Sequence, residues 1–424
     1  MALGKRNGRG RGILGRDSHA SVIVGTLSPT TLRRHAVTLV YTEPMRLKHC
    51  HNFEDYRALA RRRLPAPIFH YIDGGADDEV TRRKNVESFE NIDLVPNVLR
   101  GVENTDMSVQ VMGQKLSVPF YCSPTALQRL FHPDGEYAVG AAASAAGTMF
   151  GVSSLGTVSL EDLRRKHETP QAYQFYFHKD RGVNRAMMER AKTAGIDVMM
   201  LTVDSITGGN RERDVRTGFT IPLRLTLGGM VSFALKPRWV LDYLRREKFR
   251  FPQLEDHIDM SGGAVSVGNY LTEMLDPAMN WDDAAEMVAQ WDGQFCLKGV
   301  MSVADAKRAV DIGCTGIILS NHGGRQLDGS RAAFEQLGEV ADAVGDDIDI
   351  MMDGGIRRGT HILKALAMGA KAVGIGRYYL FALAAAGQEG VEHALNTLKS
   401  EVERDMKLMG CTSLSQLSKT NLAF

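Results

Sequence analysis

The chain has 424 residues, of which 44% are hydrophobic and 24% are charged, and its formal net charge is +1. These proportions are ordinary for a soluble globular protein, and the length suits one large domain or two of average size. A charge this close to zero gives no general attraction for nucleic acid, so we expect no nucleic-acid partner.

The cysteines are scattered along the chain and form no CxxC pair. They are Cys50, Cys122, Cys296, Cys314 and Cys411. This spacing predicts reduced thiols in a cytosol-like compartment, with neither a disulfide framework nor a metal site. No segment reaches the roughly 18 consecutive apolar residues of a membrane-spanning helix. The nearest, Ala138–Gly156, divides better into a helix and a strand, so integral membrane insertion is not expected.

Residues 1–45 differ in composition from the rest of the chain. Their charged residues are Lys5, Arg6, Arg9, Arg11, Arg16, Arg33 and Arg34, against Asp17 and Glu43. We interpret this stretch as a disordered basic tail, which leaves residues 46–424 as one domain of a cytoplasmic protein. The alternative is an organelle transit peptide, because such peptides are rich in Arg and Ser and poor in acids, and the protein would then be mitochondrial.

From residue 118 onward, short apolar runs alternate with amphipathic stretches. The expected strands are Val118–Cys122, Thr148–Val152, Ala172–Tyr176, Asp197–Val203, Gln294–Leu297, Thr315–Leu319, Ile348–Met352 and Lys371–Ile375. The expected helices are Gly135–Ala146, Leu160–His167, Gly182–Ala194, Trp281–Trp291, Val303–Ile312, Arg331–Val344 and Thr360–Met368. Eight such units predict a TIM (β/α)8 barrel. A doubly wound open sheet is the alternative, but no GxGxxG motif follows the first strand.

Two regions fall outside this alternation. Residues 52–117 are expected to form an N-terminal helical segment, with helices at Phe53–Arg63 and Pro67–Ile72. Residues 205–280 form an insertion after the fourth strand that is too long for an ordinary connection, which points to a functional role.

Polar residues gather where the strands end, and in a TIM barrel the chemistry lies at the carboxyl ends of the strands. Lys298 closes the fifth strand, where a buried ammonium needs either an ion-pair partner or an electron-rich cofactor ring. Asp204 and His322 follow the fourth and sixth strands, and a carboxylate beside a histidine stabilises the protonated imidazole of a catalytic base. Arg325 follows close behind and could clamp a carboxylate.

The last two strand ends predict a phosphate site. Asp353-Gly354-Gly355-Ile356-Arg357 and Gly374-Ile375-Gly376-Arg377 combine glycines, which let backbone N–H groups approach an anion, with arginines that bind it. The alternative is that these glycines only allow tight turns.

The segment Ser320–Asp328, with sequence SNHGGRQLD, resembles the active-site signature of the FMN-dependent 2-hydroxy-acid dehydrogenase and oxidase family. That family includes L-lactate dehydrogenases, glycolate oxidases and mandelate dehydrogenases. The resemblance runs from about Phe53 to Leu383 and includes Pro124-Thr125-Ala126, Gln174-Phe175-Tyr176, Thr202-Val203-Asp204 and Lys298-Gly299.

The resemblance implies FMN as cofactor, a small L-2-hydroxy acid as substrate, and a role for each matching residue. His322 would be the base, Asp204 would stabilise its imidazolium, and Tyr176 would bond the reacting oxygen. Arg211, Arg325 and Tyr71 would hold the substrate carboxylate. The cofactor would lie against Ala126, Ser153, Gln174, Thr202, Lys298, Ser320, Asp353, Gly354, Gly355, Arg357, Gly376 and Arg377. Arg213 is near enough in sequence to Arg211 to be the alternative second clamp.

Two departures bear on substrate and location. Leu155 stands where glycolate oxidases carry a bulky aromatic residue, so we favour L-lactate, and next a longer or aromatic acid, over glycolate. The insertion most resembles that of bacterial respiratory L-lactate dehydrogenases, and its apolar stretch Leu225–Leu235 is flanked by basic and aromatic residues. This composition suits a peripheral contact with the inner membrane and a quinone or cytochrome acceptor. The alternative is a loop packed on the barrel or in a subunit contact.

Several functions therefore stay open at this level. An oxidase that uses O2 on a longer, aromatic or glycolate-like acid is the nearest alternative. An FMN-dependent isomerase or a flavin-free nucleotide dehydrogenase would share the phosphate end but would not need His322 beside Arg325. A non-catalytic flavin-binding protein would have lost the base or the clamp. We also expect a homo-oligomer.

Overall fold

The structure is a computed structural model, and it describes residues 46–219, 226–246, 248, 250–255 and 274–424. The expected basic tail and parts of the insertion, among them residue 225, lie outside these described residues.

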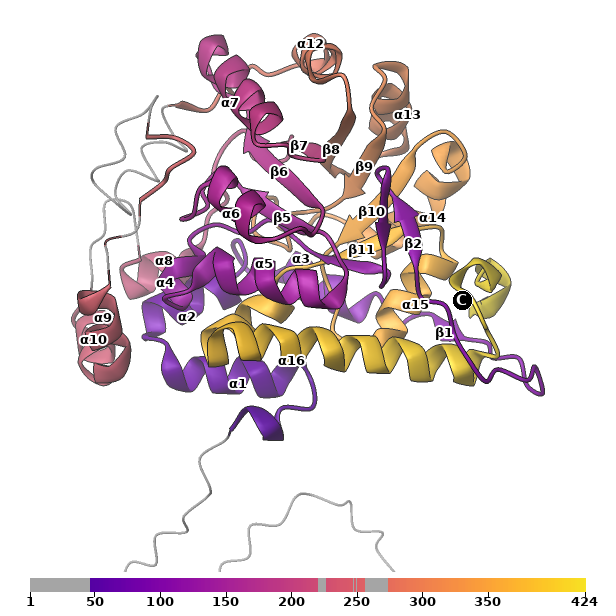
Figure 1. Ribbon diagram of the computed structural model, residues 1–424, viewed down its shortest axis with the longest axis horizontal. Helices are drawn as coiled ribbons and strands as arrows, with labels where there is room; N and C mark the ends of the chain where they lie inside the picture. Colours follow the sequence, from indigo (N-terminus) through magenta and orange to yellow (C-terminus); the bar gives the residue numbers. More distant parts are fainter. Residues whose placement is uncertain (1–45, 220–225, 247, 249, 256–273) are drawn as a thin grey trace, which may run out of the picture. The chain divides into compact units, whose positions relative to one another are not determined.

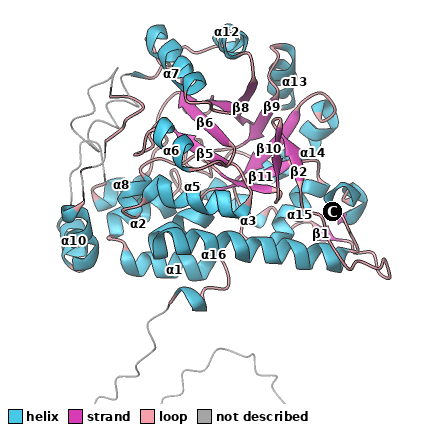
Figure 2. Cartoon of the chain, viewed as in Figure 1, coloured by secondary structure: helices cyan, strands magenta, loops and turns pink. Residues whose placement is uncertain are grey.

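All eight expected strands are present and close into one parallel barrel (Figures 1 and 2), in the order β10-β11-β4-β5-β6-β7-β8-β9. They are β4 Phe120–Cys122, β5 Phe150–Ser153, β6 Gln171–Tyr176, β7 Val198–Thr202, β8 Gln294–Val300, β9 Gly316–Leu319, β10 Asp349–Asp353 and β11 Ala372–Ile375. The strands are almost continuously buried, as parallel strands covered on both faces should be. The TIM barrel is confirmed, and its closure excludes the open doubly wound sheet.

The seven expected helices are also present, two with the expected ends and five with ends shifted by one or two residues. They are α5 Gly135–Ala146, α6 Leu160–Lys166, α7 Arg181–Thr193, α12 Trp281–Trp291, α13 Val303–Asp311, α14 Ala333–Val344 and α15 Gly359–Ala367. Local capping explains where several of them begin. The Ser159 hydroxyl accepts a hydrogen bond from the Asp162 N–H at 3.1 Å, and Asn280 and Asp283 form a capping box at the start of α12.

An eighth helix, α16 (Arg377–Met409), was not among the expected helices. It follows β11 and packs against both α5 and α1, Phe53–Arg63 (Figure 1). The helix is interrupted at Ala386 and Gly387, where the Gly387 φ is 62°. A Cβ on Gly387 would lie 2.5 Å from the ring of His132, so only glycine fits at this break.

The N-terminal segment is helical only in part, and this corrects the expectation for residues 52–117. Helices α1, α2 (Ala66–Asp73) and α3 (Val80–Glu87) are present, but Val109–Leu116 forms the hairpin β2–β3. The hairpin packs apolar side chains into the amino-terminal end of the barrel. A Cβ at Gly316 would lie 2.1 Å from the Met112 sulfur, so the approach is close. A barrel of eight strands must fill its interior with side chains, and this hairpin supplies some of them.

The remaining short elements complete the described chain. They are η1 Leu47–His49, β1 Asp93–Leu94, β2 Val109–Val111, β3 Gln114–Leu116, α4 Gln128–Phe131, α8 Glu212–Thr217, α9 Leu227–Ala234, α10 Pro237–Arg245, η3 Leu414–Gln416, η4 Lys419–Asn421 and β12 Leu422–Ala423. Helices α8 and α9 of the insertion pack on α2, and α10 packs on α9. Within the described ranges, every helix is too short or too polar to span a bilayer.

Candidate active site

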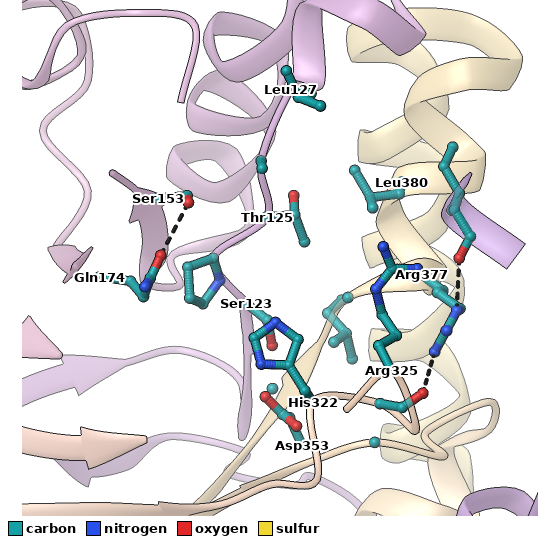
Figure 3. Close-up of a pocket in the computed structure, with 18 of the residues that line it drawn as sticks. Ser123, Thr125, Leu127, Ser153, Gln174, His322, Arg325, Asp353, Arg377 and Leu380 are labelled. Atoms are coloured by element: carbon teal, nitrogen blue, oxygen red, sulfur yellow. Dashed lines mark hydrogen bonds between the residues drawn. The ribbon is translucent and has the colours of Figure 1, made fainter. Parts of the chain in front are cut away.

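A belt of hydrogen-bonded polar side chains lines the carboxyl ends of neighbouring barrel strands. On β5 and β6, the Ser153 hydroxyl donates to the Gln174 side-chain carbonyl at 2.9 Å (Figure 3). The Gln174 amide in turn donates to the Thr202 hydroxyl on β7 at 2.8 Å. In the strand register Ser153 pairs with Gln174, whereas Thr202 pairs with Tyr176, two residues beyond Gln174 on the same face of β6. Ser153, Gln174 and Thr202 were all expected to contact a cofactor.

The belt continues into a buried ion pair between β8 and β10. Lys298 Nζ lies 3.2 Å from Asp353 Oδ2 and donates to the Ser320 hydroxyl at 3.1 Å, and Ser320 in turn donates to Asp353 at 2.5 Å. Burial lowers the pKa of Lys298, but the charges of Asp353 and Asp204 outweigh it, so the pKa is raised overall. The ammonium is therefore ion-paired, and it also lines the cavity described below; its contact with a cofactor ring stays a prediction.

His322 and Asp204 come together at the mouth of the barrel. His322 Nδ1 lies 3.0 Å from Asp204 Oδ1, and the Ser205 hydroxyl donates to the same carboxylate oxygen at 2.9 Å. Burial lowers the pKa of His322, and Asp204 opposes this effect without cancelling it. The imidazole is therefore held neutral near neutral pH, which is the form that accepts a proton.

The backbone at this point is shaped to bring the pair together. His322 has a φ of 57°, in the left-handed region, and its N–H donates to the Ser320 hydroxyl at 3.0 Å. Gly299 has a φ of 110°, and a Cβ there would lie 2.6 Å from Asp204 Cβ. The absence of a side chain at Gly299 therefore leaves the space that the Asp204 side chain occupies.

Two arginines expected to clamp a carboxylate face the cavity around Tyr71. The guanidinium carbon of Arg325 lies 4.9 Å from the centre of the Tyr71 ring, and that of Arg211 lies 5.9 Å from it. Arg211 Nε is buried without a hydrogen-bond partner, and burial lowers the pKa of Arg325 to about 10. Within the described ranges neither guanidinium has a carboxylate within ion-pair distance, so an anionic ligand would improve their electrostatic balance.

The structure decides between Arg211 and Arg213. Arg213 Nη1 lies 2.9 Å from Asp73 Oδ2, and the Arg213 side chain also pairs with Glu79. Arg213 is thus used in structural ion pairs away from the cavity, whereas Arg211 lines it. The alternative clamp is therefore not supported.

These side chains surround one cavity with an empty volume of about 1440 Å³, its open mouth included. Figure 3 shows Ser153 and Gln174 on one side, Arg377 and Leu380 on the other, and His322 between them. The expected site residues that line it are Tyr71, Ala126, Ser153, Gln174, Tyr176, Thr202, Arg211, Lys298, His322, Arg325, Asp353, Gly354, Gly355, Arg357, Gly376 and Arg377. Asp204 and Ser320 do not line the cavity themselves. Asp204 is hydrogen-bonded to His322 and Ser320 to Lys298, and both of these partners do line it.

One end of the cavity suits a phosphate group. Arg357 and Arg377 meet there, and burial lowers the pKa of both, that of Arg357 to about 10. In the described part of the chain their hydrogen bonds go to backbone carbonyls, including that from Arg377 Nη2 to Gly74 at 2.6 Å. Helix α16 begins just after Gly376, and a Cβ at Gly376 would meet open space. Two half-buried cations and a helix amino terminus facing empty space fit a phosphate-bearing cofactor.

Sequence reasoning missed several apolar residues of the cavity. Leu127, Phe131, Phe219 and Leu380 all line it, and the Phe219 ring packs on Tyr71 with centroids 5.1 Å apart. Leu127 directly follows the recognised Pro124-Thr125-Ala126 motif, so its neighbourhood could have been inferred. Phe219 and Leu380 lie in the insertion and in the unexpected helix, and nothing in their local sequence indicates a site.

The fold and site together define a TIM-barrel protein in which a histidine–aspartate pair and two arginines share a cavity with an end that suits a phosphate group. A family model described as FMN-dependent dehydrogenase matches residues 60–424, and the chain belongs to this family. FMN is therefore its cofactor, and the arginine-lined end of the cavity fits the FMN phosphate.

Named relatives agree with this assignment. A provisionally named L-lactate dehydrogenase of Mycobacterium tuberculosis is 40% identical over 380 residues, which cover 89% of this chain and 90% of that protein. Glycolate oxidase 1 of Oryza sativa subsp. indica is 38% identical over 371 residues, covering 88% and 95%. The crystal structure of a monotopic membrane protein, (S)-mandelate dehydrogenase, superimposes with a TM-score of 0.84 at 33% identity, covering 88% and 99%.

Proposed function

We propose that this flavoenzyme oxidises a small L-2-hydroxy acid, with L-lactate as the first candidate, to the corresponding 2-oxo acid. The observation that carries the proposal is the placement of His322, backed by Asp204, in the same cavity as Arg211 and Arg325. A base and a carboxylate clamp at one site are what removal of the hydroxyl proton from a 2-hydroxy acid needs.

Each end of the substrate would meet a different group. Arg325 and Arg211 would bind the carboxylate, with the Tyr71 hydroxyl as a further donor. His322 would take the hydroxyl proton, and the negative charge of Asp204 would stabilise the imidazolium that forms. Tyr176 would donate to the reacting oxygen, since burial raises the pKa of its phenol to about 12 and keeps it protonated. Fixing both ends of the acid would orient its α-carbon toward the cofactor.

The remaining site residues would hold FMN. Bound FMN supplies the two-electron oxidant, and its reduction adds negative charge to the ring system. Lys298 would offset that charge, while Asp353 and Ser320 hold the ammonium in place. Arg357, Arg377 and the glycines at 354, 355 and 376 would bind the phosphate. Ala126, Ser153, Gln174 and Thr202 would line the ring and its chain.

The apolar part of the cavity supports an acid larger than glycolate. Leu155 lines the cavity and is only 3% exposed, and Phe131, Phe219 and Leu380 also line it. A methyl or larger substituent on the substrate would contact such side chains, whereas the hydrogen of glycolate would not. The second candidate is an O2-using oxidase of a longer, aromatic or glycolate-like acid, which is favoured by the identity shared with glycolate oxidase 1.

A peripheral membrane contact and a quinone or cytochrome acceptor form the finer part of this proposal. Leu227 and Leu235 at the ends of α9 and Leu244 on α10 are 75%, 72% and 72% exposed. Lys236, Arg238 and Arg245 lie among them, and basic residues beside exposed leucines favour a bilayer interface. The similar (S)-mandelate dehydrogenase is titled a monotopic membrane protein.

Lysate fractionation tests this contact. Recovery in the membrane fraction at low salt is expected, with release by a Leu235→Glu, Leu244→Glu double variant. Full recovery of the unaltered chain in the soluble fraction at low salt would contradict the contact. A separate measurement, light scattering on the purified protein, would test the expected homo-oligomer.

Anaerobic reduction of the bound flavin tests the reaction itself. Addition of L-lactate to the yellow protein is expected to bleach its visible absorbance rapidly, with slower bleaching by glycolate and L-mandelate. Admission of air would then distinguish an oxidase, which recovers its colour quickly, from a dehydrogenase, which does not. If no 2-hydroxy acid bleaches the flavin, the protein still binds FMN but the proposed reaction is wrong.

A further inference from the structure

The loops that follow β7 and β9 are joined through the side chain of Gln326. Its Nε2 donates to the backbone carbonyls of Asp204 at 3.1 Å and Thr207 at 2.9 Å, and its Oε1 accepts from the Gly209 N–H at 3.0 Å. These contacts use both amide donors and the acceptor of one side chain. They all reach the segment 204–209, which begins with the partner of His322 and ends two residues before Arg211.

The two loops also touch through their backbones. A Cβ on Gly209 would lie 2.2 Å from the Arg325 carbonyl oxygen and 2.9 Å from Gln326 Cα. Any larger residue would push the loops apart, so glycine at 209 is what permits the Gly209 N–H to reach Gln326. The contact therefore depends on both the amide at 326 and the glycine at 209.

The opposite side of the β7 loop is held by different contacts. Arg213 pairs with Asp73 and Glu79, and Asn210 Nδ2 donates to Asp77 at 2.8 Å. These bonds hold the Arg211 end of the loop but do not reach Asp204. The contacts of Gln326 differ from these because they reach Asp204 as well as Gly209, two residues before Arg211.

We propose that Gln326 is a positioning residue that sets the loop of Asp204 and Arg211 against the loop of His322 and Arg325. The base pair and the carboxylate clamp each take one member from each loop, so a shift between the loops would disturb both. This inference rests on the proposed function for its kinetic consequences. Gln326 itself is absent from the lining of the cavity, so its effect would be indirect.

Two substitutions separate this role from simple space filling. Gln326→Met has nearly the same length and offers none of the three hydrogen bonds. Gln326→Glu keeps an acceptor for Gly209 but places a carboxylate oxygen against two carbonyls. Leu327→Ala is the matched control, because Leu327 is the next residue and is 74% exposed.

For both Gln326 variants, the KM for L-lactate is expected to rise about tenfold, from loosened hydrogen bonds near Arg211. For Gln326→Met, which adds no charge, the acid limb of the kcat/KM profile is expected to move to lower pH, because a displaced Asp204 supports the His322 proton less. FMN content and melting temperature should stay near those of the unaltered protein. Leu327→Ala should change none of these. Unaltered KM and pH profile in an FMN-loaded Gln326 variant, or equal effects in Leu327→Ala, would overturn the proposal.

Amide hydrogen exchange gives a readout that does not depend on activity. The peptide covering residues 205–211 should exchange faster in Gln326→Met and Gln326→Glu than in the unaltered protein or Leu327→Ala. If no 2-hydroxy acid reduces the unaltered protein, the proposed function fails, and exchange alone then decides the role of Gln326. Equal exchange in all four proteins would refute it.

Discussion

His322 Nδ1 lies 3.0 Å from Asp204 Oδ1, although 118 residues separate them in the chain. The pairing leaves Nε2 as the ring nitrogen without a protein hydrogen bond in the described part of the chain. The Asp204 side chain is 11% exposed, and among the described residues its second carboxylate oxygen has no hydrogen-bond partner. Its charge therefore acts on the imidazole beside it as well as on Lys298.

Replacement of the base should remove the chemistry and leave the cofactor in place. For His322→Gln, we expect anaerobic flavin reduction by L-lactate to slow by roughly 10²–10⁴-fold, the usual contribution of a general base. The FMN content should be unchanged, because the phosphate end of the cavity is untouched. Stopped-flow absorbance measures the rate, and a variant that is reduced at the original rate would contradict the assignment of His322.

Loss of the Asp204 charge should move the pH profile in a defined direction. Asp204 raises the pKa of His322 against the lowering effect of burial, so Asp204→Asn should lower that pKa further. The base would then stay deprotonated to lower pH, and the acid limb of kcat/KM should shift to lower pH while kcat falls. A shift to higher pH, measured over the stable range, would show that another charge governs His322.

Substitutions of the two proposed clamp arginines, Arg211 and Arg325, should have a different effect from substitution of Arg213. Arg211→Lys and Arg325→Lys lose the bidentate fork, so the KM for L-lactate is expected to rise by tenfold or more in each. Arg213→Lys is the control, and its effect should fall on thermal stability because Arg213 pairs with Asp73 and Glu79. Steady-state kinetics with a melting curve for each variant distinguishes these outcomes. A larger KM effect at position 213 than at 211 would reverse the assignment.

Leu155 should influence substrate size. Leu155→Phe would narrow the cavity and should raise the kcat/KM ratio of glycolate to L-lactate by about tenfold, because one methyl group is worth roughly 1–3 kcal/mol of discrimination. Leu155→Met keeps the volume and serves as the control. An unchanged ratio in Leu155→Phe would mean that the substrate side chain points elsewhere in the cavity.

Asp73 should contribute stability that depends on pH. Burial raises its pKa, but the hydrogen bonds and charge of Arg57 outweigh burial and lower the pKa from 3.8 to about 2. A carboxyl whose folded pKa is depressed stabilises the fold above its unfolded pKa, and this contribution is lost as the pH falls through about 2. Linkage makes the contribution roughly 2 kcal/mol near neutral pH.

Asp73→Asn tests this contribution directly. The variant should be less stable than the unaltered protein in urea at pH 7, and the difference should shrink as the pH falls from 4 toward 2. Glu54→Gln is the control, since it removes a carboxylate that also contacts Arg57 but is 68% exposed in its side chain. A constant difference at all pH values would mean that Asp73 acts through packing and not through its charge.

The prediction of the barrel from sequence succeeded because its signal is local. Each of the eight strands is a short apolar run buried on both faces, and most of the runs are followed by a stretch with helical spacing. The carboxyl end of every strand can then be read from the sequence, so Lys298, His322 and Asp353 could be predicted to lie at the same mouth of the barrel. The hairpin at Val109–Leu116 gave no comparable signal, since its short strands are defined by the barrel interior that they fill.

What the sequence by itself determined was therefore the fold and the chemical types at the site, together with most of the polar residues that line the cavity. The tertiary structure alone selected Arg211 over Arg213, because the choice depends on where Asp73 and Glu79 lie. It also placed Phe219 and Leu380 in the cavity and joined the two active-site loops through Gln326. Sequence patterns record which face of an element is buried, whereas these contacts join residues distant in the chain and depend on how the loops are packed in space.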